Sequence, residues 1–406
     1  MEARPINPLA LTPEEWAPIV RPLGGRPYHG RQIFRWIHAR GIVEVDRMSD
    51  LPKELRSGLG SLELDRTFAI GQIRRSLDAT RKVLVRLRDG ATVETVLIPG
   101  VNAGPGRLPA PALPSGDDAG AALPSGGDAD AAAADDDEDD GDAAAGPGSE
   151  SRVRVTQCIS TQVGCAMGCV FCASGVAGLK RHLGADEIVA QVVVGRSLLE
   201  PGERLSNVVF MGMGEPLHNY EATARALRLL MHEDGVALSA RRITVSTSGL
   251  VPEIARLGAD FGGAIGLAVS LHAADDRTRS SLMPINRKYP LSSLMEALRA
   301  YPLPRRRRIT IEYTLVAGRN DDTAEARTLC KLLRGLPVKV NLIPMNPIGA
   351  STLGPPDLSR ILGFQQVVCD AGYSCFIRRR RGDDVGAACG QLALHGAKPK
   401  VRVNRS

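Results

Sequence analysis

The stretch that decides the fold is residues 153–172, which read VRVTQCISTQVGCAMGCVFC. The run over 153–158 is typical of a strand. It leads into a loop with three cysteines at Cx3Cx2C spacing, Cys165, Cys169 and Cys172. Gly164 and Gly168 give this loop the backbone freedom to wrap tightly. The stretch therefore predicts a strand whose carboxyl end carries a cysteine loop.

Three thiolates from one loop indicate an iron–sulfur cluster. Such clusters are most often held by four cysteine thiolates, so a loop with three leaves one iron without a protein ligand. The open iron of a [4Fe–4S] cluster can bind the amine and carboxylate of S-adenosylmethionine for one-electron reduction of its sulfonium. The alternative is a structural zinc site, with His182 as an awkwardly spaced fourth ligand. We expect the cluster.

Strand and helix patterns alternate from residue 152 onward. This alternation is typical of parallel strands joined by right-handed crossovers. Six βα units predict an α/β fold, a partial (β/α)6 barrel, with ligand sites at the carboxyl ends of its strands. The expected strands are 153–158, 206–211, 242–247, 264–271, 309–316 and 338–344, and the expected helices include 185–199, 219–232, 251–257, 292–300 and 323–334.

Polar residues and glycines stand where several of these strands end. The run Gly212-Met-Gly-Glu-Pro216 lacks the last glycine of a dinucleotide fingerprint, but its backbone and Glu215 suit the methionyl ammonium of a cofactor. Each polar residue alone is more often a satisfied structural group. Together they predict a cofactor collar that includes Ser246, Ser270, His272 and Asn346.

The chain before the barrel divides into two parts. Residues 1–66 predict a helical accessory domain, with helices at 29–39 and around 53–59. Residues 67–100 predict a strand meander with a hairpin turn at Asp89-Gly90. Glu94 lies in the second strand of that hairpin, and the pattern alone favours a solvated face for its carboxylate.

Residues 101–151 contain ten Asp and two Glu against one Arg, among Ala, Gly, Pro and Ser. Such a segment buries too little apolar surface to offset its ordering entropy, so we expect a disordered acidic insertion. The rest of the chain then carries 50 basic and 33 acidic residues, a net charge of +17 within a total of +6. This excess indicates a polyanionic partner such as RNA.

Several protein classes are disfavoured by the sequence. No apolar run is long enough to span a bilayer, and the first residues lack a secretory h-region. Eight cysteines in a long chain without a signal are read as reduced, so a cytoplasmic location and no membrane are expected. The core is expected over 152–350, with a C-terminal segment over 351–406. Cys330, Cys369 and Cys375 are expected to be inert.

The combined motifs resemble the radical-SAM rRNA/tRNA adenine-C2 methyltransferase family RlmN, over about residues 28–100 and 152–395. The resemblance implies methylation of C2 of one adenosine in 23S rRNA and of the adenosine 3′ of the anticodon in some tRNAs. It rests on the cysteine loop and on Gly212–Pro216, Val245-Ser-Thr-Ser-Gly249, Ser270-Leu-His272, Ile343-Pro-Met-Asn-Pro347 and Arg381-Gly-Asp-Asp-Val-Gly-Ala-Ala-Cys389-Gly-Gln391.

The resemblance also implies site roles. Cys389 matches the cysteine that becomes S-methylated, Cys158 its transient disulfide partner, and Glu94 the proton acceptor, which reverses the solvated-face reading. Two molecules of S-adenosylmethionine are used per turnover: one methylates Cys389, and the other yields the radical that activates that methyl for addition to C2. The matching cofactor contacts are Gly214, Glu215, Ser246, Ser270, Leu271, His272 and Asn346.

Some alternatives stay open at this point. Methylation at adenine C8 uses the same cysteines, and a zinc-stabilised RNA-binding protein without catalysis is a candidate from another class. A glycyl-radical activating enzyme is disfavoured by the Cys389 segment. Besides RNA, the partners expected are an electron donor and a thiol reductant, and a monomer suffices. The arginines of Arg378–Arg381 are expected to lower a thiol pKa and contact phosphate.

Overall fold

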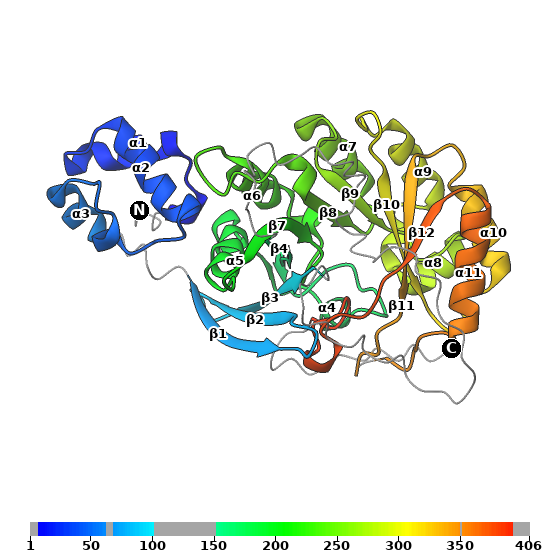
Figure 1. Cartoon of the computed structure of the whole chain (residues 1–406). Helices are drawn as coiled ribbons and strands as arrows, with labels where there is room; N and C mark the ends of the chain where they lie inside the picture. Colours follow the sequence, from blue (N-terminus) through cyan, green and yellow to red (C-terminus); the bar gives the residue numbers. More distant parts are fainter. Residues whose placement is uncertain (1–6, 62–67, 101–151, 350, 393–406) are drawn as a thin grey trace, which may run out of the picture.

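The computed structural model describes residues 7–61, 68–100, 152–349 and 351–392 (Figure 1). The acidic insertion expected at 101–151 lies outside these residues. Within them, no helix combines the length and the apolar character that crossing a membrane requires.

One sheet of ten strands runs through the molecule in the order β1-β2-β3-β4-β7-β8-β9-β10-β11-β12. From β4 to β12 all neighbouring strands are parallel, which confirms the predicted α/β class. Strand β12 was not expected, because its four residues are too few for a recognisable pattern. The parallel strands are β4 (Val153–Cys158), β7 (Glu203–Phe210), β8 (Ile243–Thr247), β9 (Gly266–Ser270), β10 (Ile309–Leu315), β11 (Val338–Pro344) and β12 (Ser374–Ile377).

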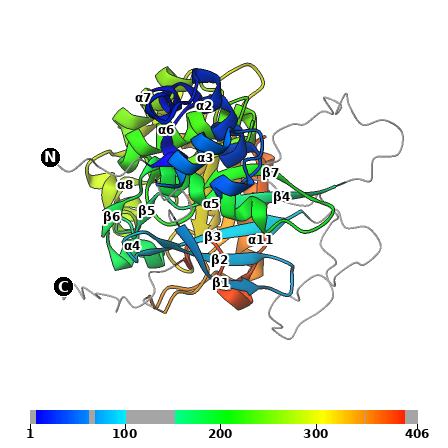
Figure 2. The same ribbon diagram turned by 90° about the vertical axis from the view of Figure 1, so that its left-hand side faces the viewer.

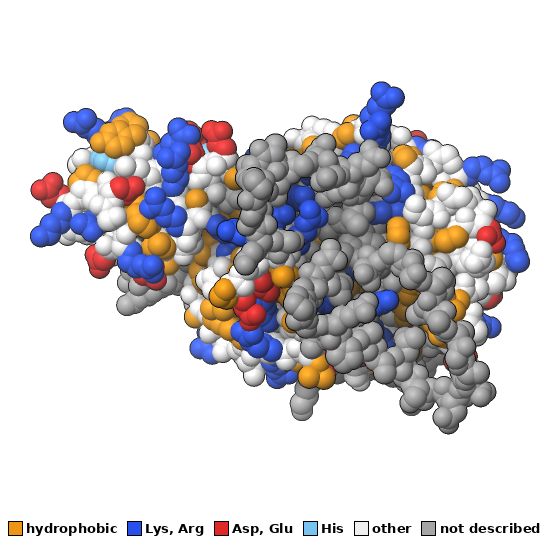
Figure 3. Space-filling view, viewed as in Figure 1, with side chains coloured by type: hydrophobic (Ala, Val, Ile, Leu, Met, Phe, Trp, Pro, Cys, Tyr) orange, Lys and Arg blue, Asp and Glu red, His pale blue; other side chains and the backbone are white. Residues whose placement is uncertain are grey.

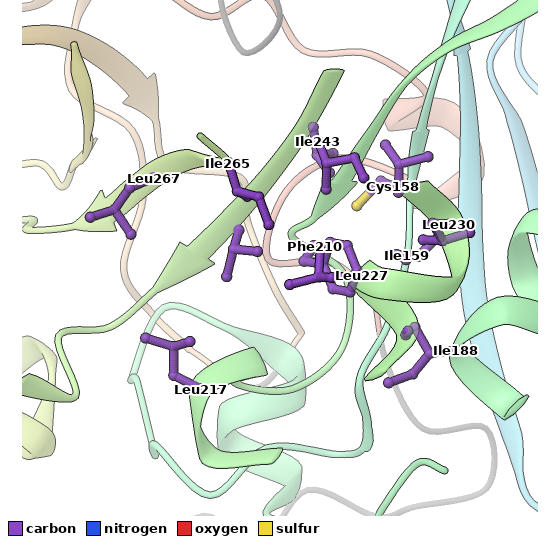
Figure 4. Packing of buried hydrophobic residues seen from close by; sticks show 14 of the residues in the cluster. Cys158, Ile159, Ile188, Phe210, Leu217, Leu227, Leu230, Ile243, Ile265 and Leu267 are labelled. Carbon is purple, nitrogen blue, oxygen red and sulfur yellow. The ribbon is translucent and has the colours of Figure 1, made fainter. Parts of the chain in front are cut away.

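Helices follow most of the parallel strands and cover the outer face of the sheet (Figure 1). Figure 4 shows part of this packing: Leu227 of α6 lies beside Phe210 of β7, and Ile188 of α5 belongs to the same buried cluster. The helices are α4 (Ala173–Ala177), α5 (Ala185–Ser197), α6 (Tyr220–Met231), α7 (Val251–Phe261), α8 (Asp276–Leu282), α9 (Leu291–Ala300), α10 (Thr323–Leu332) and α11 (Leu358–Asp370). Short 3-10 turns lie at Pro216–Asn219, Ala240–Arg242, Pro284–Arg287 and Asp383–Val385 (η9).

The predicted meander is part of the same sheet. Strands β1 (Phe68–Arg75), β2 (Arg81–Leu87) and β3 (Thr92–Pro99) are antiparallel. Strand β3 also pairs antiparallel with β4, where Val96 lies opposite Cys158. The pairing places the strand that carries Glu94 beside the strand that leads to the cysteine loop. A small hairpin of β5 (Gln162–Val163) and β6 (Arg181–His182) stands apart from this sheet.

The N-terminal helices pack over α5 and α6, as Figure 2 shows from the side. Arg225 of α6 donates to the backbone oxygen of Ala10 at 2.9 Å, and Arg35 pairs with Asp234 at 2.6 Å. The helix expected at 29–39 begins at Pro27 and ends in a π turn. The elements are α1 (Pro13–Val20), α2 (Pro27–Phe34), the π turn (Arg35–Ala39), α3 (Lys53–Gly60) and 3-10 turns at Pro8–Ala10, Arg21–Leu23 and Val45–Arg47.

Candidate active site

The cysteine loop follows β4 and β5 and is held by backbone contacts. The amide of Cys165 donates to the oxygen of Gly178 at 3.2 Å. Gly164 and Gly168 both have positive φ, at 81° and 68°. A Cβ on Gly164 would stand 1.9 Å from the Gly178 oxygen, so this turn requires glycine. The loop therefore depends on a backbone approach that other residues would block.

The three thiols of the loop lie near enough to influence one another's charge. Burial, with a smaller contribution from the nearby Cys172, raises the pKa of Cys165 to about 12. Burial likewise raises the pKa of Cys169, with contributions from Cys172 and Cys165. All three are free thiols. Such buried thiols gain from a bound cation, because a metal deprotonates the thiols that coordinate it.

These thiols fit a multi-iron cluster better than a single ion. Among the described side chains, no three His, Cys, Asp or Glu converge closely enough to bind one metal. The ligands of a [4Fe–4S] cluster each take a different iron and need no common point. His182, the proposed fourth zinc ligand, contacts Gln162 at 3.0 Å instead. One buried atom near the end of β11, Asn346 Oδ1, is without a partner among the described residues and suits a polar cofactor.

Glu215 is buried among these strand-end residues and accepts hydrogen bonds from two of their loops. Its Oε2 accepts from the Ser248 amide at 2.7 Å, and its Oε1 accepts from the Leu217 amide at 3.1 Å. Burial raises the pKa of Glu215. Gly214, just before it, has a φ of 102° and packs against Gln162. The Glu215 carboxylate thus joins the loop after β7 to the loop after β8, in addition to any contact with a cofactor.

The residues at the ends of β8 and β9 differ in their burial and in the backbone bonds that they make. Ser246 and Ser270, on β8 and β9, are half-buried. Leu271 is fully buried, and its amide and carbonyl are already bonded to Glu312 and Arg279. It therefore offers apolar contact only.

His272 marks the next position with an unusual backbone. Its φ is 59°, and its Nδ1 accepts from the Thr314 amide at 2.8 Å. Its ring meets Phe171 edge-on at 4.8 Å, so it contacts the cysteine loop directly. Burial lowers the pKa of His272 to about 3, and the imidazole is neutral at physiological pH.

The C-terminal segment returns to the cysteine loop and lies beside α4 in Figure 1. The side-chain amide of Asn346 donates to the backbone oxygen of Cys389 at 2.9 Å. The Ala173 amide donates to the Gly390 oxygen at 2.8 Å, and Ser174 Oγ donates to the Leu392 oxygen at 2.6 Å. These bonds bring Cys389 to the loop that ends in Cys172, although the two are far apart in sequence.

One cavity at the carboxyl ends of the strands contains Cys158, Cys172 and Cys389 together with Arg378 and Met211. Cys389 is exposed, whereas Cys158 is buried. Burial and, to a smaller extent, Cys389 raise the pKa of Cys158 to about 12, and the Arg378 guanidinium opposes this shift. The two cysteines proposed to exchange sulfur bonds therefore share one cavity, both as free thiols.

Glu94 is buried, with 2% of its surface exposed, so the pattern-based expectation of a solvated face is wrong. Its Oε1 lies 3.1 Å from Lys82 Nζ, and its backbone oxygen accepts from Ser160 Oγ at 2.6 Å. The residue shares a strand face with Val96 and Ile98, which line the cavity. The structure thus places this carboxylate on the wall that leads to Cys158.

Two functional neighbours were missed from the sequence. Lys82 contacts Glu94, and nothing in its strand pattern distinguishes it from a surface lysine. Arg279 is fully buried and donates to the backbone oxygens of Leu271 at 3.0 Å and Ser248 at 2.8 Å. It holds two strand ends in place, a role with no local sequence signal.

The arginine run is mostly engaged within the protein. Arg378 faces the cavity, Arg380 donates to the Met345 oxygen at 3.1 Å, and Arg381 pairs with Asp78 at 2.9 Å. Arg379 is exposed. Other Lys and Arg side chains recur over the face in Figure 3, including the N-terminal helices. These surfaces remain candidates for phosphate contact.

Comparison with known proteins agrees with this geometry. Residues 159–330 match the family model described as the radical SAM superfamily, and residues 6–63 match the ribosomal RNA large subunit methyltransferase N-terminal domain. The superfamily uses a [4Fe–4S] cluster and S-adenosylmethionine. A crystal structure of a radical SAM methyltransferase from Sphaerobacter thermophilus superposes with a TM-score of 0.79 at 41% identity, covering 96% of this chain and 99% of that one.

Two full-length relatives carry the same description, dual-specificity RNA methyltransferase RlmN. The one from Sorangium cellulosum is 66% identical, with 99% of each chain covered. The one from Syntrophobacter fumaroxidans is 42% identical, covering 93% of this chain and 94% of its own length. The expected family and radical-SAM fold are thereby confirmed, and the non-catalytic zinc protein is ruled out. With its thiols, its fold and its full-length relatives in agreement, the chain belongs to the RlmN family of radical SAM methyltransferases.

Proposed function

We propose that this chain methylates C2 of an adenosine in 23S rRNA and of the adenosine 3′ of the anticodon in some tRNAs. The relatives named dual-specificity RNA methyltransferase support two RNA substrates. The observation that carries the chemistry is the single cavity in which Cys389 lies beside both Cys158 and Cys172. A cavity of this kind brings a methyl-carrying thiol, its thiol partner and a cluster ligand within one reaction space.

Cys165, Cys169 and Cys172 would hold the cluster. When bound, the cluster supplies the electron that splits S-adenosylmethionine into methionine and a 5′-deoxyadenosyl radical. The proposed contacts of that cofactor are Gly214, Glu215, Ser246, Ser270, Leu271, His272 and Asn346. Support comes from their position at the strand ends and from the unpartnered Oδ1 of Asn346.

Cys389 is proposed to carry the methyl group to RNA. Adenine C2 is an electron-poor carbon without a lone pair, so it cannot attack a sulfonium methyl directly. A cysteine thiolate is a competent nucleophile and can take the methyl first. Transfer of a hydrogen atom from that S-methyl to the 5′-deoxyadenosyl radical leaves a carbon radical that adds to C2. The exposure of Cys389 at the cavity supports access by a base.

Glu94 and Cys158 are proposed to complete the transfer. One electron would pass from the adduct to the oxidised iron–sulfur cluster, and the Glu94 carboxylate accepts the C2 proton. The Cys158 sulfur then attacks the Cys389 sulfur, a disulfide forms, and the electron pair of the broken carbon–sulfur bond goes to carbon, which takes a proton. A thiol reductant must reduce that disulfide before the next turnover. Burial raises the pKa of Cys158 to about 12, which disfavours the thiolate. The nearby Arg378 charge acts in the opposite direction and assists ionisation of this thiol.

The test is anaerobic reconstitution followed by incubation with S-adenosylmethionine, a reductant and unmodified rRNA or tRNA fragments. Mass spectrometry of nucleosides and of the Cys389 peptide would detect 2-methyladenosine and methylated Cys389. An 8-methyl product would move the chain to the C8 branch. A protein that cleaves S-adenosylmethionine but methylates neither RNA nor Cys389 would refute the proposal.

A pair of serine variants tests the role of Cys158. In Cys158→Ser the carbon–sulfur bond cannot be resolved, so a covalent protein–RNA species should accumulate on denaturing gels. The matched control is Cys375→Ser, since Cys375 is also buried but lies on β12 outside the cavity lining. It should turn over without trapping RNA. Equal release of methylated RNA by both variants would contradict the assignment.

The electron donor, the thiol reductant, a monomeric state and a cytoplasmic location remain part of the proposal. Size measurement of the reconstituted enzyme with and without RNA would test the monomer. A dimer that persists at assay concentration would overturn it.

A further inference from the structure

Lys82 occupies the gap between Glu94 and the segment that carries Cys389. Its Nζ lies 3.1 Å from Glu94 Oε1 and donates to the backbone oxygen of Gly386, also at 3.1 Å. The Lys82 and Glu94 side chains are 11% and 3% exposed. Gly386 lies three residues before Cys389 and follows η9. One ammonium thus touches the proposed base and the proposed methyl carrier's loop at once.

The strand register makes this arrangement specific. Lys82 of β2 lies opposite Val96 of β3, which in turn lies opposite Cys158 of β4. Residues directly opposite in a sheet share a face, so all three side chains project to the same side. Glu94 is two residues before Val96 and projects to that side too. Lys82 is therefore fixed by the same ladder that fixes Cys158.

We infer that Lys82 is a positioning residue that orients the Glu94 carboxylate and docks the Cys389 loop against it. The inference rests on the proposed function, since it assigns no proton or methyl to Lys82 itself. An ammonium beside a buried carboxylate makes a charge-assisted contact that fixes the direction in which the carboxylate points. Its second hydrogen bond satisfies a backbone oxygen next to the loop. Loop docking and the placement of the Glu94 carboxylate therefore both depend on Lys82.

Other contacts hold the start of the segment, and the bond from Asn346 to the Cys389 oxygen holds its end, so Lys82 anchors the stretch between them. The Gly382 amide donates to Asp78 Oδ2 at 3.0 Å, and Arg381 pairs with the same carboxylate at 2.9 Å. The Leu77 amide donates to Asp384 at 3.3 Å. These contacts anchor residues 381–384 to the β1–β2 turn independently of Lys82. Loss of Lys82 should therefore loosen residues 386–389 selectively, without releasing the whole segment.

Four variants separate the two roles of Lys82. Lys82→Met keeps the aliphatic stem and removes the charge, and Lys82→Arg keeps the charge. Glu94→Gln removes the base but leaves an oxygen that the ammonium can contact. The double variant Lys82→Met/Glu94→Gln leaves no unpaired buried charge, so it guards against misfolding of the single variant. Lys331→Met, an exposed lysine of α10, is the matched control.

Hydrogen exchange of the cluster-free chain, which needs no activity, is the first readout. Amides of 386–389 should exchange about tenfold faster in Lys82→Met and in the double variant. They should stay near wild type in Glu94→Gln, Lys82→Arg and Lys331→Met. Equal exchange in Lys82→Met and Lys331→Met would overturn the docking role.

Single-turnover RNA methylation by enzyme with a reconstituted cluster is the second readout. Lys82→Met should lose about tenfold or more in rate, and Lys82→Arg should recover most of that loss, which a merely structural role of the side chain would not predict. A wild-type rate in Lys82→Met would refute the inference. Absence of 2-methyladenosine with the wild-type enzyme would instead refute the proposed function, and the exchange result would still decide the docking role.

Discussion

Replacing Gly164 by alanine should destabilise the cysteine loop and reduce cluster binding. The φ of 81° costs an L-residue about 1–2 kcal/mol. The new Cβ would lie 1.9 Å from the Gly178 oxygen and 3.0 Å from its carbonyl carbon. Because backbone atoms cannot rotate away, overpacking adds about 1–3 kcal/mol. Loss of the bond from the Cys165 amide to that oxygen adds about 1 kcal/mol. The total is about 3–6 kcal/mol.

Two measurements follow the loop separately from catalysis. Denaturant unfolding of the cluster-free chain reports the loss in free energy of unfolding. Iron per chain after anaerobic reconstitution reports whether the three thiols still assemble the cluster. We expect a large shift of the unfolding midpoint and clearly reduced iron in Gly164→Ala.

Gly202→Ala is the control. Its φ is 83°, but a Cβ there would meet nothing within 4 Å. It should cost only the backbone term, about 1–2 kcal/mol, and retain full iron. If Gly164→Ala unfolds at the same denaturant concentration as Gly202→Ala and binds as much iron, the argument from the Gly178 contact is wrong.

Three further changes test other parts of the structure. Arg81→Met should cost about 3–5 kcal/mol in unfolding, because Arg81 is 2% exposed and pairs with Glu203 at 2.7 Å; a loss below 1 kcal/mol would contradict this. His38→Phe should flatten the acid side of the curve of stability against pH. Burial lowers the pKa of His38 to about 3, so between pH 3 and about 6.5 the unfolded chain binds a proton that the folded chain does not. In the wild type, stability therefore falls by up to about 1.4 kcal/mol for each unit by which the pH is lowered. An unchanged slope in urea titrations would refute this. Asn346→Ala should slow methylation of Cys389 about tenfold by releasing its backbone oxygen, read by mass spectrometry of the peptide; a wild-type rate would show that the bond is dispensable.

The barrel elements were predictable because their patterns are local. Buried parallel strands read as apolar runs, and each expected strand lies within a few residues of the one observed. The cysteine spacing likewise carries its own chemistry. By contrast, β12 has only four residues and is recognisable only through its pairing with β11. In a segment this short, the alternation of apolar and polar residues does not identify a strand, because the strand is determined by its pairing with β11.

The position of Glu94 shows why burial was harder to predict. Residues 93–97 of β3 are all buried, so both faces of this strand are covered. Alternation identifies which residues share a face, but not whether a distant segment covers that face. Here the covering contact includes Lys82 and Gly386, and the bond between them joins residues far apart in sequence. The Cys389 environment depends on the same return of the chain.

The pairing of β3 with β4 has a consequence for protein engineering. The Gly100 amide donates to the Arg154 oxygen at 2.7 Å, and Pro99 lies opposite Val155. The two ends of the intervening stretch are therefore hydrogen-bonded neighbours, close enough for a short turn to connect them. The spacing of Glu94 and Cys158 is set by the pairing of β3 with β4 and not by the chain between these strands. We therefore expect that residues 101–151 can be removed, exchanged or replaced by a reporter domain without changing how β3 pairs with β4.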